Sequence, residues 1–222
     1  MPVRATARMM VLGMLLAIGS SGAATADSLS VNRPNPAPPP PVSAEFPDAT
    51  LVRVDQVGSV TLRLDGIITP GVEQRFNDAL RSVPASQPVV VELSSPGGFT
   101  TAGYRMIDLM LAERQAGRPI ATRVVGGQSC ESMCVGLYLA GYPRYAEPTA
   151  EFMVHAPRLA ENGRMTLRST DQMVKRLVSL GAAPAWIERV RAAGGFSGSL
   201  DYRDRADNLA AVGANIVTHL IR

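Results

Sequence analysis

Short apolar, β-branched runs alternate with helical patterns through most of this 222-residue chain, and this alternation constrains the fold more than any other feature. Residues 88–93 (PVVVEL) and 120–125 (IATRVV) are compact runs, each followed by a glycine-containing break, which is typical of buried strands. Between them, residues 104–111 repeat apolar side chains at helical spacing, and Gly117 ends the pattern. Strands that alternate with helices in this way predict an α/β fold with a largely parallel sheet.

The remaining elements follow from the same patterns. Residues 52–64 contain two apolar-rich stretches with a break between them, which predicts a pair of strands. Pro70 stands where a helix favours its first residue, and apolar residues recur behind it at helical spacing. Residues 132–139 predict a buried helix, and residues 151–154 predict a strand that leads into His155.

The first 26 residues have the organisation of an export signal. Arg4 and Arg8 precede an apolar run at 9–19, and residues 24–26 (ATA) form a cleavage signal. The alternative is an uncleaved membrane anchor, but an apolar run of eleven residues is too short to span a bilayer stably. We therefore expect residues 1–26 to be removed and the mature protein to be periplasmic or secreted, without a stable membrane span.

Residues 27–48 are rich in proline and predict an extended linker before a single domain at 49–222. Without residues 1–26, the chain carries 20 Lys and Arg against 19 Asp and Glu, and no basic cluster stands out. Because nucleic-acid binding relies on concentrated positive charge, we expect no nucleic-acid partner.

Ser132 is a candidate nucleophile because of its position. It follows a strand and the Gly126–Gly127 break, and it opens the apolar helix predicted at 132–139. A serine at such a turn has its hydroxyl near free backbone N–H groups, which favour developing negative charge. The alternative is that Ser132 or Ser129 only caps the helix.

A glycine-rich loop and a histidine are the other chemical features. The strand at 88–93 ends in Ser-Ser-Pro-Gly-Gly at 94–98, a loop whose glycines let the backbone approach a ligand closely. His155 ends an apolar strand and is one of only two histidines. The other, His219, lies near the C-terminus and has only a structural interpretation.

Together these motifs resemble the Clp protease proteolytic subunit and, more distantly, signal peptide peptidase A and the crotonase fold that they share. The resemblance covers roughly residues 60–217 and implies a fold of repeated β-β-α units. It implies that Ser132 is the nucleophile and His155 the general base. It also implies that the backbone N–H groups of Gly98 and Met133 form the oxyanion hole.

The acid of the implied Ser-His-Asp triad is less directly placed. In the family, an aspartate lies twelve residues before a C-terminal turn that residues 212–217 resemble here. This spacing favours Asp201, and Asp204 is the alternative if the chain carries an insertion or deletion. The acid would orient His155 and stabilise its charged form.

The chain also departs from the family. Glu131 places a carboxylate beside the nucleophile, where it could shape substrate choice or oppose an oxyanion. Residues 158–169 lack a convincing version of the long helix through which the family assembles rings, so homo-oligomerisation is left open. In an exported protein we expect no ATPase partner. Lys175, the only lysine, lies in a polar helix that we expect to face solvent, which argues against a Ser/Lys dyad.

Cys130 and Cys134 bracket Ser132. Their spacing matches neither a zinc site nor a redox Cys-x-x-Cys pair, so we predict no metal and no cofactor. Residues four apart on a helix lie on one face at a separation of about 6 Å, which a disulfide tolerates. In an oxidising compartment we therefore predict a Cys130–Cys134 bond.

These features favour a serine peptidase acting on peptides or unfolded segments. The alternative from another class is a catalytically silent binding or assembly module, which Glu131 and the unsettled acid would suit. Acyl-CoA chemistry on the shared fold is disfavoured because an exported protein meets little CoA.

Overall fold

The computed structural model describes residues 46–158 and 162–222, which belong to one folded unit. The predicted export signal at 1–26 and the linker up to residue 45 lie outside the described residues. Within the described part, none of the helices combines the length and the apolar character that crossing a membrane requires.

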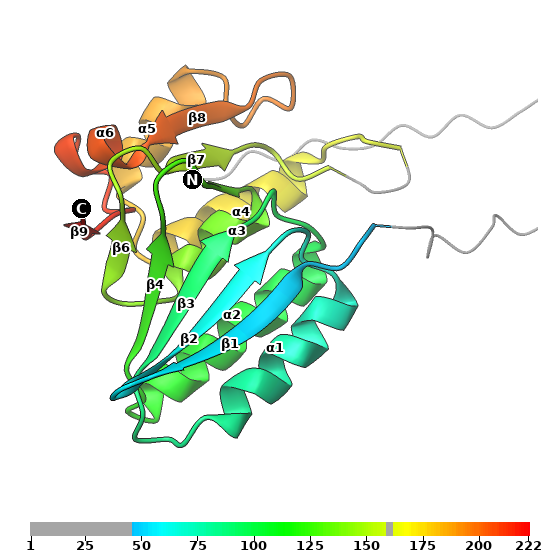
Figure 1. The fold of residues 1–222 in the computed structure, drawn as a ribbon. Helices are drawn as coiled ribbons and strands as arrows, with labels where there is room; N and C mark the ends of the chain where they lie inside the picture. Colours follow the sequence, from blue (N-terminus) through cyan, green and yellow to red (C-terminus); the bar gives the residue numbers. More distant parts are fainter. Residues whose placement is uncertain (1–45, 159–161) are drawn as a thin grey trace, which may run out of the picture. The chain divides into compact units, whose positions relative to one another are not determined.

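A six-stranded mixed sheet forms the body of the fold (Figure 1). Its order is β1-β2-β3-β4-β6-β9, in which β1 pairs antiparallel with β2 and every other pairing is parallel. The strands are β1 (Thr50–Gln56), β2 (Ser59–Asp65), β3 (Val89–Ser94), β4 (Ile120–Val124), β6 (Arg144–Ala146) and β9 (His219–Leu220). The predicted α/β fold with a largely parallel sheet is therefore confirmed.

A second, three-stranded sheet lies beside the first and carries the residues of interest. It consists of β5 (Ser129–Glu131), β7 (Glu151–Val154) and β8 (Tyr202–Arg205). β5 pairs parallel with β7, and β7 pairs antiparallel with β8. The chain order β1-β2-α1, β4-β5-α3 and β6-β7-α4 reproduces the expected β-β-α unit.

Six helices complete the described fold, and α1 and α2 pack side by side along the large sheet (Figure 1). The helices are α1 (Pro70–Ser82), α2 (Thr100–Gln115), α3 (Met133–Leu139), α4 (Leu167–Ser179), α5 (Pro184–Ala192) and α6 (Ala206–Ala211). The helix predicted behind Pro70 is confirmed. The Thr69 hydroxyl accepts a hydrogen bond from the Val72 backbone N–H at 3.2 Å, which satisfies a free donor at the start of α1.

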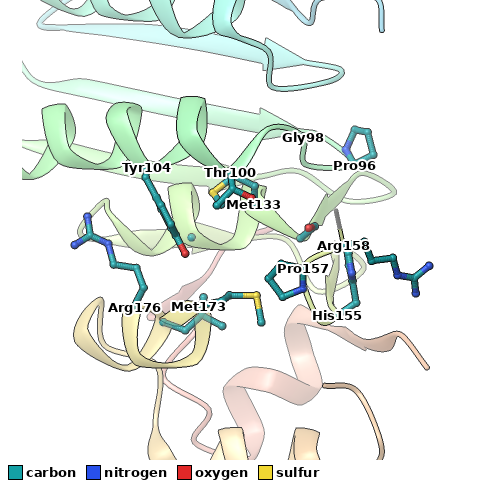
Figure 2. A pocket seen from close by; sticks show the side chains of 13 residues that line it. Pro96, Gly98, Thr100, Tyr104, Met133, His155, Pro157, Arg158, Met173 and Arg176 are labelled. Atoms are coloured by element: carbon teal, nitrogen blue, oxygen red, sulfur yellow. The ribbon is translucent and has the colours of Figure 1, made fainter. Parts of the chain in front are cut away.

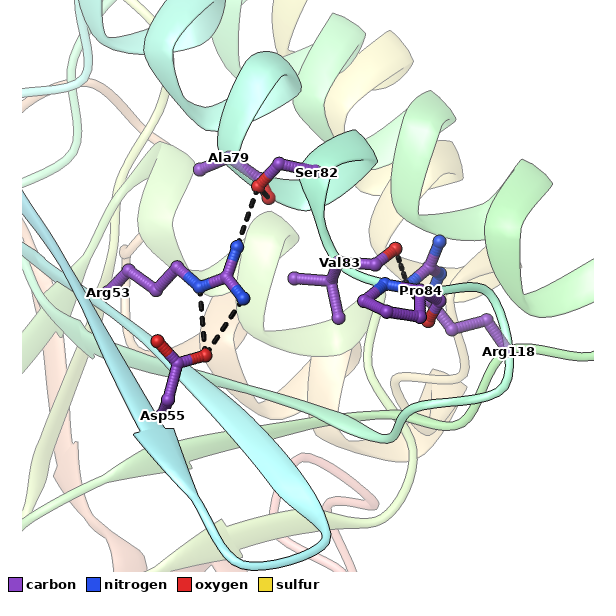
Figure 3. Close-up of polar contacts among 7 residues, drawn as sticks. All are labelled: Arg53, Asp55, Ala79, Ser82, Val83, Pro84 and Arg118. Atoms are coloured by element: carbon purple, nitrogen blue, oxygen red, sulfur yellow. Dashed lines mark hydrogen bonds and ion pairs between the residues drawn. The ribbon is translucent and has the colours of Figure 1, made fainter.

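Two arginines hold the C-terminal end of α1, one buried and one exposed (Figure 3). Arg118 is 6% exposed, and its Nη1 donates to the carbonyl oxygens of Val83 and Pro84 at 2.9 Å each. Its Nε pairs with Glu113 at 2.7 Å. Arg53 of β1 donates to the Ser82 hydroxyl at 2.8 Å from a solvent-exposed position. The end of α1 is thus tied both to β1 and to the segment before β4.

α2 and α3 approach each other closely near the start of α3. A Cβ atom at Gly103 of α2 would lie 2.1 Å from Cγ of Met133 on α3, so a larger residue at this crossing would displace the Met133 side chain. Every residue of α3 is buried, as the continuous apolar run predicted. This packing fixes the beginning of α3, where Ser132 lies.

Candidate active site

Ser132 occupies a tight turn between β5 and α3. Its backbone has φ 54° and ψ −118°, a conformation that a residue with a side chain rarely adopts outside functional turns. The predicted helix begins at Met133, one residue later than the sequence suggested, and the Ser132 side chain makes no capping hydrogen bond to it. The interpretation of Ser132 as a simple helix cap is therefore not supported.

A disulfide spans this turn. Cys130 and Cys134 are bonded with their Cα atoms 5.2 Å apart, and both are fully buried. The predicted bond is confirmed, but the reason given for it was wrong because Cys130 lies in strand β5 and only Cys134 lies in α3. The bond therefore joins a strand to a helix across Ser132 instead of bridging one helical face.

The glycine-rich loop after β3 packs directly against the serine turn. The backbone N–H of Ser95 donates to the carbonyl of Ser129 at 2.9 Å, and that of Glu131 donates to the carbonyl of Ser95 at 2.8 Å. Gly97 has φ +93°, and a Cβ there would lie 2.8 Å from Cβ of Ser132. The loop and the turn are thus held at backbone distance, which no larger residue at position 97 would allow.

Two backbone N–H groups indicate an anion-binding site where the glycine-rich loop meets the serine turn. Among the described residues, the N–H groups of Gly98 and Met133 have no hydrogen-bond acceptor. Gly98 has φ +151°, and a Cβ there would lie 2.2 Å from the carbonyl oxygen of Ile68, so the loop needs glycine here too. Free N–H groups held by a rigid backbone can stabilise a developing oxyanion.

The candidate residues share one cavity of about 220 Å³. Ser132, His155, Gly98 and Met133 all line it, although they come from three separate segments of the chain. Figure 2 shows Gly98 and Met133 on one side of the cavity and His155 on the other. The structure therefore brings together four of the five residues that the sequence assigned to catalysis.

His155 follows β7 directly and is held by its neighbour. Its Nδ1 lies 2.7 Å from the carbonyl oxygen of Ala156, and because a carbonyl only accepts, Nδ1 carries the proton. In the neutral ring Nε2 is then the free base. Within the described residues, no hydrogen bond joins His155 to Ser132, a contact that in other enzymes often tightens only when substrate binds.

Asp201 does not line the cavity, and its carboxylate is engaged elsewhere. Its Oδ1 accepts from Arg158 at 3.2 Å, with both side chains about two-fifths exposed. Asp204 accepts from the Tyr202 hydroxyl at 3.1 Å and from Asn208 at 2.8 Å. In the described residues neither aspartate forms a hydrogen bond or an ion pair with His155, so the triad inferred from the resemblance is not assembled in this conformation.

Glu131 on β5 is neutralised by an arginine on β8, two strands away across β7. Its Oε1 lies 2.6 Å from Nη1 of Arg203 on β8, and the Glu131 side chain is only 16% exposed. The hydrogen bond to Glu131 raises the pKa of Arg203 above its already high usual value. Glu131 does not line the cavity, so its carboxylate is directed to β8 and not to the cavity beside Ser132.

Sequence reasoning missed the far wall of the cavity. Tyr104 on α2 and Met173, Arg176 and Leu177 on α4 line it. They carry no motif, because only the packing of α2 and α4 beside α3 brings them together. Burial raises the pKa of Tyr104, so its hydroxyl remains a protonated donor at neutral pH.

Lys175 lies on the same helix but, as expected, faces solvent. Its side chain is 75% exposed and pairs with Asp171 at 2.7 Å. It does not line the cavity, which leaves it without a role in a Ser/Lys dyad. In the described part of the chain, no group of three or more His, Cys, Asp or Glu side chains could hold a metal ion.

Comparison with known proteins shows which family part of this chain is similar to. Residues 78–180 match the model of the Clp protease family. The matched range contains Ser132, His155, Gly98 and Met133 and ends before Asp201 and Asp204.

Individual relatives are distant and only partly covered. ATP-dependent Clp protease proteolytic subunit 1 of Chlamydia muridarum is 32% identical over 85 residues, which are 38% of this chain and 42% of the relative. The protein of the same name in Chlamydia pneumoniae is 27% identical over 108 residues, 46% of this chain and 54% of the relative. The chain thus spans about half the length of the curated relatives it matches.

Proposed function

We propose that this protein belongs to the Clp protease family and is an exported serine peptidase that cleaves peptides or unfolded segments through an acyl-enzyme. The observation that carries the proposal is the shared cavity. It brings a serine in a constrained turn, a histidine with a free Nε2 and two open backbone N–H groups to one place. These are the parts that acyl transfer to serine requires.

The reaction follows from the positions of these groups. The Ser132 hydroxyl oxygen attacks the substrate carbonyl carbon while Nε2 of His155 takes the hydroxyl proton. The carbonyl oxygen becomes an oxyanion that the N–H groups of Gly98 and Met133 stabilise. His155 then gives the proton to the leaving amine as the C–N bond breaks, and water releases the acyl group by the reverse proton route. Asp201 would orient the imidazolium.

Labelling with a fluorophosphonate tests the proposal, because this reagent forms a bond with an activated serine. Ser132 should react and the other serines should not. Ser132→Ala and His155→Ala should each remove most of the labelling, and the double variant should be little worse than either because the residues act as a unit. Peptide hydrolysis should follow the same order. Correctly folded protein that does not label would contradict the proposal.

A catalytically silent binding module is the second candidate, and one observation favours it. Asp201 pairs with Arg158, and in the described residues Ser132, His155 and Asp201 share no hydrogen bond. Such a module would bind peptides in the cavity without labelling at Ser132. Self-assembly, the other role of a silent member, would appear in sedimentation analysis as a homo-oligomer that forms without an ATPase partner.

Export is part of the same proposal and has its own test. Residues 1–26 have the charge, apolar run and cleavage site of an export signal. N-terminal sequencing of the protein from an exporting cell should find Asp27 first, in the periplasmic or secreted fraction. Residues 1–26 retained on protein in the cytoplasmic fraction would contradict it.

A further inference from the structure

The cavity around Ser132 is lined by two arginines and, among the described residues, by no acidic side chain. Arg158 lies near His155, and Arg176 lies at the opposite end beside Tyr104 (Figure 2). A cavity with guanidinium groups and no carboxylate in its wall favours substrate groups that accept hydrogen bonds or carry negative charge.

The end that contains Arg176 is a small hollow with apolar walls and a polar limit. Met133, Met173 and Leu177 supply the apolar surface. The polar limit is formed by Tyr104, whose hydroxyl makes no hydrogen bond among the described residues, and by Arg176. A long side chain with an apolar stem and a polar end fits this arrangement.

Arg176 is held in place but has unused donors. Its Nη2 pairs with Asp108, one turn after Tyr104 on α2, and its guanidinium carbon lies 5.8 Å from the centre of the Tyr104 ring. Its Nε is buried, whereas its Nη1 makes no hydrogen bond among the described residues and is the donor that remains for a ligand. Asp108 does not line the cavity, so the pair fixes the arginine from outside while the cavity side stays open to a ligand.

The hollow lies on the acyl side of the scissile bond. His155 must give its proton to the leaving amine, so the leaving segment lies toward His155. Tyr104 and Arg176 lie across the cavity from His155 (Figure 2). The side chain that enters the hollow therefore belongs to the residue whose carbonyl Ser132 attacks.

We infer that this hollow selects peptides with glutamate or glutamine at the residue whose carbonyl Ser132 attacks, and that Arg176 and Tyr104 are the specificity determinants. The inference rests on the proposed function and names its substrate class. A carboxylate or amide oxygen can accept from Arg176 and from the Tyr104 hydroxyl. A leucine would leave both donors unpaired in a partly dry site, and a lysine would place a second cation beside Arg176.

Fluorogenic peptides Ala-Ala-X-aminomethylcoumarin, with X as Glu, Gln, Leu or Lys, test the selection. We expect kcat/KM for Glu and Gln to exceed that for Leu and Lys by about tenfold or more. Arg176→Met, which keeps the length but removes the charge, should reduce the Glu/Leu ratio about tenfold, and Tyr104→Phe should reduce it less. Asp108→Asn should also reduce the ratio, but less than Arg176→Met, because it weakens the pair that fixes Arg176 in the cavity wall.

Lys175→Met is the matched control. It removes a positive charge from the adjacent position of α4, on a side chain that faces solvent, and should leave the ratio unchanged. An equal loss in Lys175→Met and Arg176→Met would mean that only the general charge of α4 matters. That result would overturn the assignment of Arg176.

Binding to Ser132→Ala separates this inference from the proposed function. Fluorescent peptides that end in Ala-Ala-Glu or Ala-Ala-Leu can be titrated by polarisation, which needs no turnover. If the Glu peptide binds selectively, Arg176→Met abolishes that binding, and the wild type hydrolyses no peptide, the assignment of the hollow holds and the proposed peptidase activity is wrong. Hydrolysis with a preference for Leu would support the proposed peptidase activity and overturn the assignment of the hollow. Neither binding nor hydrolysis of any peptide would overturn both.

Discussion

His155 and Asp201 stand at matching positions immediately beyond the end of the β7–β8 ladder. The last residues paired across these strands are Val154 and Tyr202, so the next residues in each direction are His155 and Asp201. Residues opposite one another in an antiparallel pair project to the same face. Asp204 is paired with Phe152 and belongs to the other face. Of the two candidate acids, only Asp201 is therefore positioned to reach His155 by a side-chain movement.

This relationship predicts different effects for the two aspartates. Asp201→Asn should lower the rate of fluorophosphonate labelling on the order of tenfold or more, because the imidazolium of His155 loses its counter-charge. Asp204→Asn should change the rate less than about twofold, provided that circular dichroism shows an intact fold. An equal loss of labelling rate in both variants would mean that the two aspartates support His155 together. A loss in Asp204→Asn alone would assign the role of the acid to Asp204.

The pair of Glu131 and Arg203 gives a second prediction. Because Arg203 neutralises the carboxylate, Glu131→Ala should leave labelling of Ser132 nearly unchanged. Arg203→Met leaves an unpaired, mostly buried carboxylate one residue from the nucleophile, and it should slow labelling roughly three- to tenfold by opposing the oxyanion. The double variant should return close to the wild-type rate, a coupling that a double-mutant cycle measures directly. Faster labelling in Glu131→Ala alone would show that the carboxylate opposes catalysis even when paired.

The elements that could be predicted from the sequence are those with long, repeated patterns. The strands around residues 52–64 and 88–93 and the helix behind Pro70 lie where their periodicity indicated. β5 was missed because three residues are too few to show a period. Its omission also explains the wrong account of Cys130, which was read as helical because it lies four residues before Cys134, close to one helical turn.

Some residues of the candidate site could likewise be predicted from local sequence patterns, and others could not. Ser132 and His155 could be named because each follows a strand within a local motif. Tyr104 and Arg176 could not, because their cavity position depends on two helices packing against α3 from distant parts of the chain. Asp201 falls between these cases, since a count along the chain favoured it and the register of β7 and β8 supplies the physical reason.

The two arginines at the end of α1 predict contrasting effects on stability (Figure 3). Arg118→Met leaves two carbonyl groups and Glu113 without a buried donor, which should cost about 2–3 kcal/mol of the free energy of unfolding. For a domain of this size, that corresponds to a melting temperature lower by roughly 4–12 °C. Arg53→Met removes an exposed ion pair and should cost less than about 1 kcal/mol. Thermal unfolding of both variants measures this difference in stability. Equal losses of stability in the two variants would contradict the role given to the burial of Arg118.

The disulfide across Ser132 should matter more for reactivity than for stability. It closes a very short loop, so removing it in the double variant Cys130→Ala/Cys134→Ala should lower the free energy of unfolding by only about 2 kcal/mol. The same change releases β5 from α3 on both sides of a residue held at φ 54°, and the turn can then relax away from the geometry that exposes the hydroxyl. We expect labelling of Ser132 to slow several-fold, both in this variant and in wild type treated with a reductant.

Arg118→Met is the control, because it costs similar stability far from the cavity and should label at the wild-type rate below its melting temperature. Equal slowing in that control would attribute the effect to stability alone, and unchanged labelling in the cysteine variant would show that the backbone hydrogen bonds hold the turn without the disulfide.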